Sequence, residues 1–172
     1  MAIAVNKVLD VADGTRPGQF EVGDRRKVQS LSDLDPVYRQ LLDGPVTAVV
    51  SVIGSTGLSN LSPVWFDYDG DLVFLNMASH RKKVNWLRNN PHATFLLMNP
   101  ENAYHWLSIK ARRARGLRGR PAGGSARHDH IDKMWAKYIQ TPGGYSLRDP
   151  SRDERRILFE LRVDSVATFG RP

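Results

Sequence analysis

The segment from Val46 to Met77 constrains the fold most strongly, because strand-like runs alternate with tight turns along it. Residues 46–53 are β-branched and apolar, and residues 58–68 alternate until Asp69-Gly70, a dipeptide typical of a two-residue hairpin turn. Residues 71–77 resume the strand pattern. Three consecutive strands with tight turns predict an antiparallel meander within a barrel or curved sheet, not alternating strand–helix units.

The rest of the chain adds strands and short helices to this meander. Alternation predicts strands at residues 92–98, 104–115 and 157–169. Apolar spacing predicts helices at residues 36–42, 79–88 and 127–139, and Asp33 and Ser79 are the predicted N-caps of the first two. Glycines predict a loop at residues 116–124. Residues 1–30 show no sustained period, so we expect an N-terminal extension that lies over the body or is partly mobile. The prediction is one mainly β domain at residues 31–172 with flanking helices.

Composition excludes several classes of function. The chain has 172 residues and no cysteine, which excludes disulfides and cysteine nucleophiles and fits a cytoplasmic protein. No apolar run approaches the roughly 18 residues of a membrane helix, so no membrane partner is expected. His128 and His130 stand two apart in a predicted helix, where side chains point in different directions, so no metal site is expected. The sequence indicates no catalytic side chain.

Charge is concentrated in one part of the chain. The net charge is +7, and residues 81–120 hold 10 Lys and Arg against one Asp or Glu. Such a basic block indicates an anionic partner. One part of it, Ser79 to Lys83, begins a predicted helix and suits a phosphate, with a solvated helix face as the alternative. The second part, Lys110 to Arg120, suits a polyanion or protects a sheet edge; its neighbours Tyr104 and Trp106 leave nucleic acid as a less favoured partner.

Several motifs in combination resemble one superfamily. Residues 57–71 read Gly-Leu-Ser-Asn-Leu-Ser-Pro-Val-Trp-Phe-Asp-Tyr-Asp-Gly-Asp, and Arg81-Lys82-Lys83, residues 87–91 and residues 99–102 follow. This arrangement resembles the flavin and deazaflavin oxidoreductases, the split β-barrel superfamily that includes pyridoxamine 5′-phosphate oxidase. Within it, the chain resembles the actinobacterial branch that binds the deazaflavin coenzyme F-420. The resemblance implies a split β-barrel and a homodimer.

The resemblance also implies which residues would bind the cofactor. The ring would lie along the strand that follows the first turn, beside Asn60, Ser62, Pro63 and Val64. The ribityl chain would lie at the end of the next strand, beside Asn76, Ala78 and Ser79. Arg81 and Lys83 at the helix start would hold the phosphate, and Lys110 and Arg112 in the second basic run would hold an anionic tail.

The function implied is that of an F-420-dependent oxidoreductase, which passes a hydride from the reduced deazaflavin to a small unsaturated organic acceptor. An FMN-dependent oxidase or reductase is the first alternative. FMN carries a single phosphate, so this alternative leaves the second basic run without a role in cofactor binding. A non-catalytic member of the superfamily that binds a cofactor, a tetrapyrrole or nucleic acid is the other.

Overall fold

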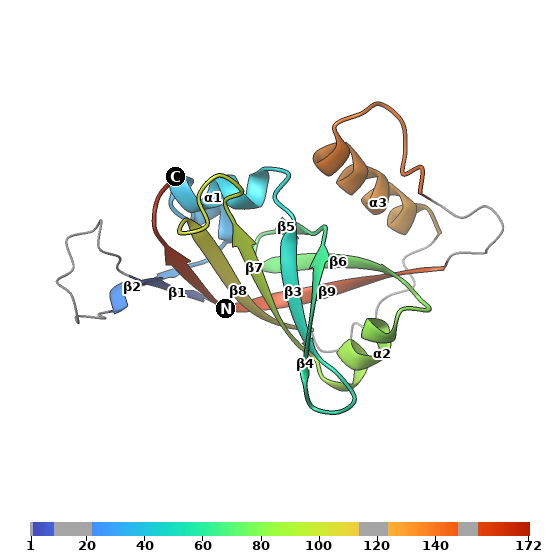
Figure 1. The fold of residues 1–172 in the computed structure, drawn as a ribbon, viewed down its shortest axis with the longest axis horizontal. Coiled ribbons are helices and arrows are strands. Elements are labelled where there is room, and N and C mark those ends of the chain that lie inside the picture. Colours follow the sequence, from blue (N-terminus) through green and yellow to red (C-terminus); the bar gives the residue numbers. More distant parts are fainter. Residues whose placement is uncertain (1, 9–21, 114–123, 148–154) are drawn as a thin grey trace.

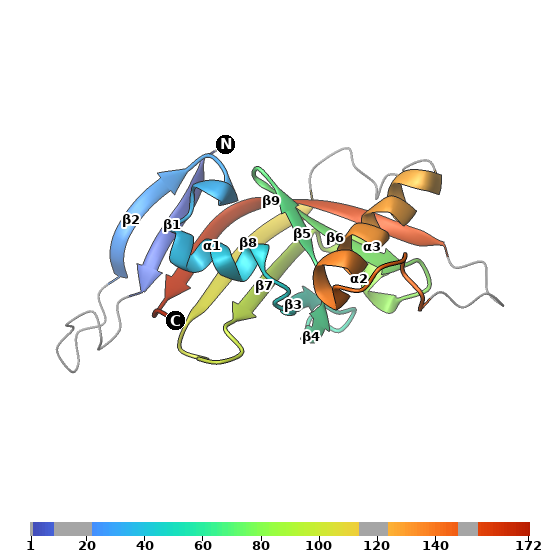
Figure 2. The same cartoon turned by 90° about the horizontal axis from the view of Figure 1, so that it is seen from above.

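The computed structural model describes residues 2–8, 22–113, 124–147 and 155–172, and its strands form one curved sheet (Figures 1 and 2). The elements in chain order are β1 (Ile3–Val8), β2 (Val22–Val28), α1 (Pro36–Asp43), β3 (Ala48–Ile53), β4 (Ser59–Val64), β5 (Asp67–Asp69), β6 (Leu72–Ala78), α2 (Lys82–Asn89), β7 (His92–Met98), β8 (Trp106–Arg113), α3 (Gly124–Ile139) and β9 (Arg156–Phe169), with one 3₁₀ turn at Leu31–Asp33. The predicted class, mainly β with flanking helices, is confirmed.

The sheet has the order β2-β1-β9-β8-β7-β3-β4, and β6 pairs with both β5 and β9. All these pairs are antiparallel except β1 with β9, which is parallel. Among the described strands, β2 and β4 stand at the two ends of this order and do not pair with each other. The sheet therefore curves without closing its hydrogen-bond ladder into a complete barrel.

Strand β9 joins the two parts of the sheet. Its residues 156–162 pair with β6, and its residues 165–169 pair with β1. Strand β8 pairs with residues 161–169 of β9, so it lies along the other edge. A strand of 14 residues thus connects the β5–β6 hairpin to the β1–β2 hairpin.

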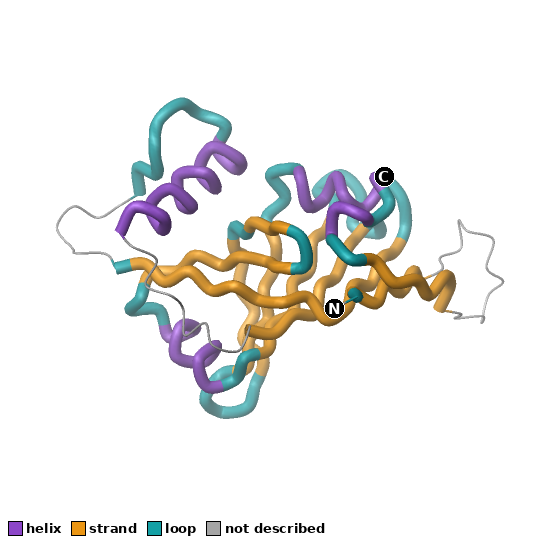
Figure 3. The backbone as a smooth tube through the Cα atoms, turned by 180° about the vertical axis from the view of Figure 1, so that it is seen from behind, coloured by secondary structure: helices purple, strands orange, loops and turns teal. Residues whose placement is uncertain are grey.

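The core lies on the inner face of this sheet. The predicted alternation in β8 is confirmed, since Leu107 and Ile109 are fully buried while Lys110 is exposed. Phe95 of β7 and Phe159 of β9 are also fully buried. Helix α1 covers one end of the core, whereas α2 and α3 flank the other (Figures 1 and 3). No helix in the described ranges is long and apolar enough to cross a membrane.

Both predicted N-caps are wrong. Asp35 caps α1 by accepting the Val37 N–H at 3.0 Å, while Asp33 accepts the Ser30 N–H at 2.9 Å and completes the capping box of the 3₁₀ turn. Ser79 does not cap α2, because the helix begins at Lys82 and Arg81 is its N-cap residue. The Ser79 N–H instead donates to the Arg155 carbonyl at 2.7 Å.

The predicted meander is wrong in one connection. Strand β4 ends at Val64 and the chain turns before Asp67, so the expected strand over residues 58–68 is broken where Phe66 enters the core. The hairpin at Asp69-Gly70 is confirmed as the β5–β6 turn. However, β6 continues along β9 rather than along β4. A long-range pairing replaces the local one.

The described residues of the predicted extension at residues 1–30 contain two strands. Strands β1 and β2 pair with each other, and β1 adds to the sheet along β9. The predicted loop at residues 116–124 lies outside the described residues except for Gly124, which begins α3.

Gly170 provides a test of how closely the C-terminal residues pack. Its φ is +68°, and a Cβ at this position would lie 2.0 Å from the Tyr104 carbonyl oxygen. We expect Gly170→Ala to lower the free energy of unfolding by at least about 3 kcal/mol, because backbone strain and a clash with backbone add together. Urea unfolding measures the change.

Gly57→Ala is the matched control, since φ is +82° there and the added Cβ would meet no described atom within 4 Å. It should cost only the backbone term of about 1–2 kcal/mol. Equal losses in the two variants would contradict the packing described for Gly170.

Candidate functional site

Two adjoining cavities form a continuous groove between β4, β6, α2 and α3. Their volumes are about 450 Å³ and 380 Å³. They are continuous because the same five residues line both: Pro63, Asn76, Tyr145, Leu147 and Arg156. We call the larger cavity, which reaches α2, the basic end of the groove, and the smaller one, which reaches α3, the apolar end.

The basic end is formed where α2 begins. Arg81 is the N-cap residue of α2, and Lys83 follows within its first turn. The Lys83 amine donates a hydrogen bond to the Ser62 hydroxyl of β4, which aims it across the groove. Burial, together with the charge of Arg81, lowers the pKa of Lys83. An anion bound between Arg81 and Lys83 would offset both the cost of burying the charged amine and the repulsion between the two cations. This end of the groove is therefore suited to a phosphate.

A third cation, Arg156, lies where the two cavities meet. It is 9% exposed, its Nε donates to Asn76 Oδ1 at 2.6 Å, and its guanidinium lies 5.2 Å from the centre of the Tyr145 ring. The pairing of Arg156 with Ala78 fixes it at the start of β9, directly across from the end of β6. A buried arginine on the wall of a cavity is uncommon and points to an anionic or strongly polar ligand.

The apolar end is lined by side chains from the end of β4 and from α3, including Val64, Trp65 and Met134. Tyr138 of α3 stacks on Trp65, with ring centroids 5.2 Å apart and planes at 8°. The Tyr138 hydroxyl accepts the Phe66 N–H at 3.3 Å and shares its proton between the carbonyls of Phe66 and Val46. These contacts hold α3 over the turn that follows β4, which keeps this end of the groove apolar.

His130 contributes to the docking of α3 against the strands. Its Nε2 lies 3.8 Å from the buried Asp67 carboxylate, with which Lys133 also forms an ion pair. Burial lowers the pKa of His130. Within the described ranges, no group of three His, Cys, Asp or Glu side chains is arranged to hold a metal ion.

Strand β4 presents a backbone edge to the groove. Among the described strands, β4 pairs only with β3, so its second edge is available for hydrogen bonds. Pro63, the residue before the last of β4, fits such a position, because a residue without an N–H is tolerated on edge strands. A flat ligand with polar edges can bind beside this strand.

Seven of the eleven residues predicted for the cofactor line the groove: Ser62, Pro63, Val64, Asn76, Ala78, Arg81 and Lys83. The structure does not bring the other four to its walls. Asn60 is exposed on β4, and Ser79 bonds to the backbone of Arg155. Lys110 and Arg112 lie on the outer face of β8, where Arg112 Nε donates to Asp164 at 2.9 Å.

Several groove residues have no recognisable signal in the sequence, and Arg156 and Tyr145, which line both ends of the groove, are among them. Arg156 stands at the border of the last predicted strand and reads as a flanking charge. The position of Arg156 on the groove depends on the pairing of β9 with β6, which no local pattern encodes. Tyr145 is held near the groove by its N–H, which donates to Asp132 of α3 at 2.7 Å.

No protein-family model and no curated protein matches the chain, whereas many solved structures do. An F-420 reductase matches with a TM-score of 0.62 and 17% identity over 77% of this chain and 98% of that one. The heme storage protein HutZ from Vibrio cholerae matches with a TM-score of 0.56 and 15% identity over 77% and 92%. A conserved hypothetical protein from Mycobacterium tuberculosis matches with 0.53 and 17% over 83% and 89%.

The chain shares its fold with these solved structures. At such identities the likeness concerns the fold, and a heme storage protein shares it. The fold alone therefore does not identify the ligand, which depends on the side chains that line the groove.

The pKa of Lys83 tests the electrostatics of the basic end. We expect NMR titration of the free protein to show the Lys83 amine losing its proton below its ordinary pKa of 10.5. In the Arg81→Gln variant the midpoint should rise but stay below 10.5, since burial is the larger cause and the charge of Arg81 the smaller. A Lys83 midpoint at or above 10.5 in the unmodified protein would contradict this arrangement.

Proposed function

We propose that the groove binds coenzyme F-420 and that the protein is an oxidoreductase, which transfers a hydride from the reduced deazaflavin to a small unsaturated organic acceptor. The observation that carries this proposal is the joining of a basic end to an apolar end beside an unpaired edge of β4. A deazaflavin cofactor has the corresponding parts: a phosphate, a hydroxylated chain and a flat ring. The fold shared with an F-420 reductase supports the same assignment.

The residues fit such a cofactor part by part. Arg81 and Lys83 would hold its phosphate, because both cations converge at the start of α2. Ser62 and Asn76 offer hydrogen-bonding groups between the two ends. Val64, Trp65 and Met134 would contact the ring, and the edge of β4 offers backbone groups to the polar rim of that ring.

The bound deazaflavin supplies the hydride chemistry, and the protein supplies position and electrostatics. Trp65 and Met134 exclude water from one side of the apolar end. Arg156 places a buried positive charge where the two ends meet, which stabilises negative charge on a ligand there. We assign no side chain as a proton donor.

FMN is the second candidate cofactor, and the position of Lys110 and Arg112 favours it. The resemblance assigned these two cations to the anionic tail of F-420, but they lie on the outer face of β8 and line neither end of the groove. FMN has one phosphate and needs no such cations. Titration of both cofactors against the same protein separates the two candidates.

Parallel fluorescence titrations with F-420 and with FMN test the proposal. We expect tighter binding of F-420, and we expect Lys83→Gln to weaken it at least about tenfold, because a charge-assisted hydrogen bond to phosphate is lost. Lys82→Gln is the control, since Lys82 is exposed between the two site cations and lines no part of the groove. It should change the affinity less than about twofold.

Tighter binding of FMN would replace F-420 by the second candidate. Binding of neither cofactor, together with binding of heme or another tetrapyrrole, would favour a storage role such as that in the name of HutZ.

We further propose that the protein forms a homodimer through the outer face of the sheet. Leu61 of β4 and Met98 of β7 point outward there, with exposures of 66% and 41%. Trp106 of β8 stacks on Phe169 of β9 on the same face, at 5.5 Å between ring centroids. These apolar side chains share the outer face with Lys110 and Arg112, and exposed large apolar side chains on a sheet face are typical of a covered surface.

Leu61→Glu tests this assembly. A carboxylate in an apolar interface carries a desolvation cost, so we expect the variant to be monomeric at concentrations where the unmodified protein is dimeric. Light scattering coupled to size-exclusion chromatography gives the mass. Ile139→Glu, at the far end of α3 and 39% exposed, is the control and should leave the mass unchanged. A monomeric unmodified protein would contradict the proposal.

A further inference from the structure

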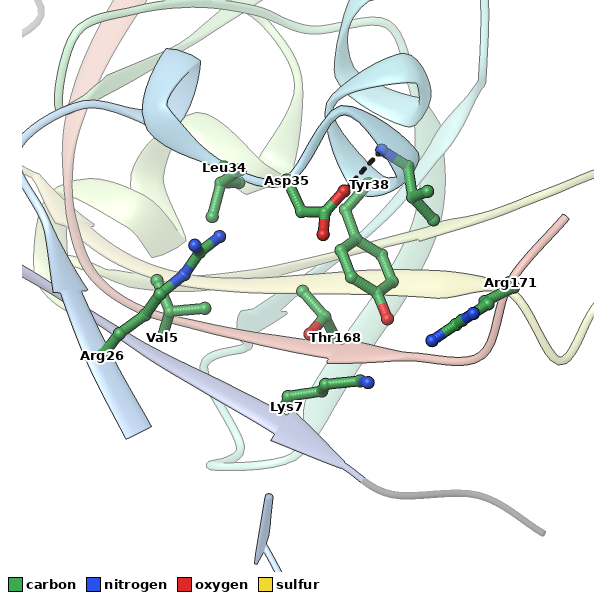
Figure 4. A pocket seen from close by; sticks show the side chains of 9 residues that line it. Val5, Lys7, Arg26, Leu34, Asp35, Tyr38, Thr168 and Arg171 are labelled. Carbon is green, nitrogen blue, oxygen red and sulfur yellow. Dashed lines mark hydrogen bonds between the residues drawn. The ribbon is translucent and has the colours of Figure 1, made fainter. Parts of the chain in front are cut away.

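A second cavity of about 370 Å³ lies at the end of the sheet opposite the groove, under α1 and beside the β1–β2 hairpin (Figures 1 and 4). Its walls combine three cations, a carboxylate, a phenol hydroxyl and apolar side chains. The lining residues are Val5, Lys7, Arg26, Leu34, Asp35, Val37, Tyr38, Thr168 and Arg171, and none of them lines the groove. We call it the hairpin cavity.

The sheet register places the floor of the hairpin cavity on the inner face. Val5 stands opposite Arg26 of β2, and Lys7 stands opposite Thr168 of β9. Val5 and Lys7 are two residues apart on β1, so the side chains of all four point to the same side. Because Val5 and Thr168 are buried, Lys7 and Arg26 extend this inner face beyond the core rather than the outer surface.

The third cation comes from the C-terminal end of the chain. The Tyr38 hydroxyl of α1 donates to the Gly170 carbonyl at 2.9 Å, which fixes the backbone next to Arg171. Figure 4 shows Lys7, Arg171 and the Tyr38 hydroxyl turned toward one another, with Arg26 on the other side of Asp35. Positive charge from three separate segments thus faces one cavity.

Asp35 is the one carboxylate among the described lining residues. One of its oxygens accepts the Val37 N–H at 3.0 Å as the N-cap of α1. Three of the described lining residues are cations, and Val5, Leu34 and Val37 add an apolar side.

We propose that the hairpin cavity binds a small organic dianion whose charges lie on carboxylate or phosphate oxygens. Arginine forks bind such oxygens in bidentate fashion, and a lysine adds a point charge. A volume near the lower end of ligand pockets suits a short dicarboxylate or a small phosphate ester rather than a ring cofactor with a tail. The apolar side accommodates its carbon chain. This site is independent of the ligand proposed for the groove.

Two-dimensional amide NMR with two separate probes, succinate and inorganic phosphate, tests the proposal. We expect saturable shifts at the amides of Val5, Lys7 and Thr168 with at least one probe. Succinate carries its two charges at separate ends and phosphate carries them at one centre, so the probe that binds more tightly identifies the arrangement of the ligand. Shifts at the start of α2 report the groove and are read separately.

The double variant Lys7→Gln, Arg26→Gln should weaken binding at the hairpin cavity at least about tenfold, because two of its three cations are lost. Lys27→Gln is the matched control, since Lys27 is exposed and pairs with Ala4 on the other face of the hairpin. It should leave the affinity within about twofold. Spectra without probe establish that each variant is folded.

Three results would overturn the proposal. One is the absence of saturable shifts at Val5, Lys7 and Thr168 with both probes at millimolar concentration. Another is an unchanged affinity in the double variant, and the last is an equal loss in Lys27→Gln, which would indicate nonspecific attraction by net charge.

Discussion

The pairing of β9 with three other strands is the interaction on which the rest of the structure depends. Hydrogen bonds to β6 hold its first half, and hydrogen bonds to β1 and β8 hold its second half. Because one continuous strand contributes to both, the spacing between the two ends of the sheet is fixed by backbone geometry. Arg156 begins this strand in the groove, and Thr168 lies near its end in the hairpin cavity. The two proposed binding sites are thus built on one rigid element.

Both the groove and the hairpin cavity are lined by cations, but the groups beside these cations differ. In the groove, the start of α2 contributes Arg81 and Lys83, the start of β9 contributes Arg156, and Trp65 and Tyr145 form an aromatic side. In the hairpin cavity the cations are balanced in part by Asp35. The net charge of +7 is therefore distributed over separate surfaces, and Lys110 and Arg112 belong to neither cavity.

Sequence patterns predicted those elements whose signals are local. Residues 92–98 form β7 with the predicted bounds, because a single period and a flanking proline define it. The β1–β2 hairpin was missed, since its strands are stabilised by pairing with β9 about 160 residues along the chain. A long-range pairing, that of β9 with β6, also explains why the position of Arg156 on the groove was not predicted. By contrast, Ser62, Arg81 and Lys83 were implied by the family resemblance of two nearby motifs, and the hydrogen bond from Lys83 to Ser62 joins these motifs directly.

Pro63 has a consequence for the behaviour of the protein in a crowded solution. An unpaired strand edge such as that of β4 can recruit a strand from another molecule and begin aggregation. Pro63 lacks the N–H that a continuous ladder needs, so an incoming strand would lose a hydrogen bond near the end of the edge. A ligand that needs only one or two backbone contacts meets no such obstacle. The same residue that leaves the groove accessible to small molecules thus protects its edge against other chains.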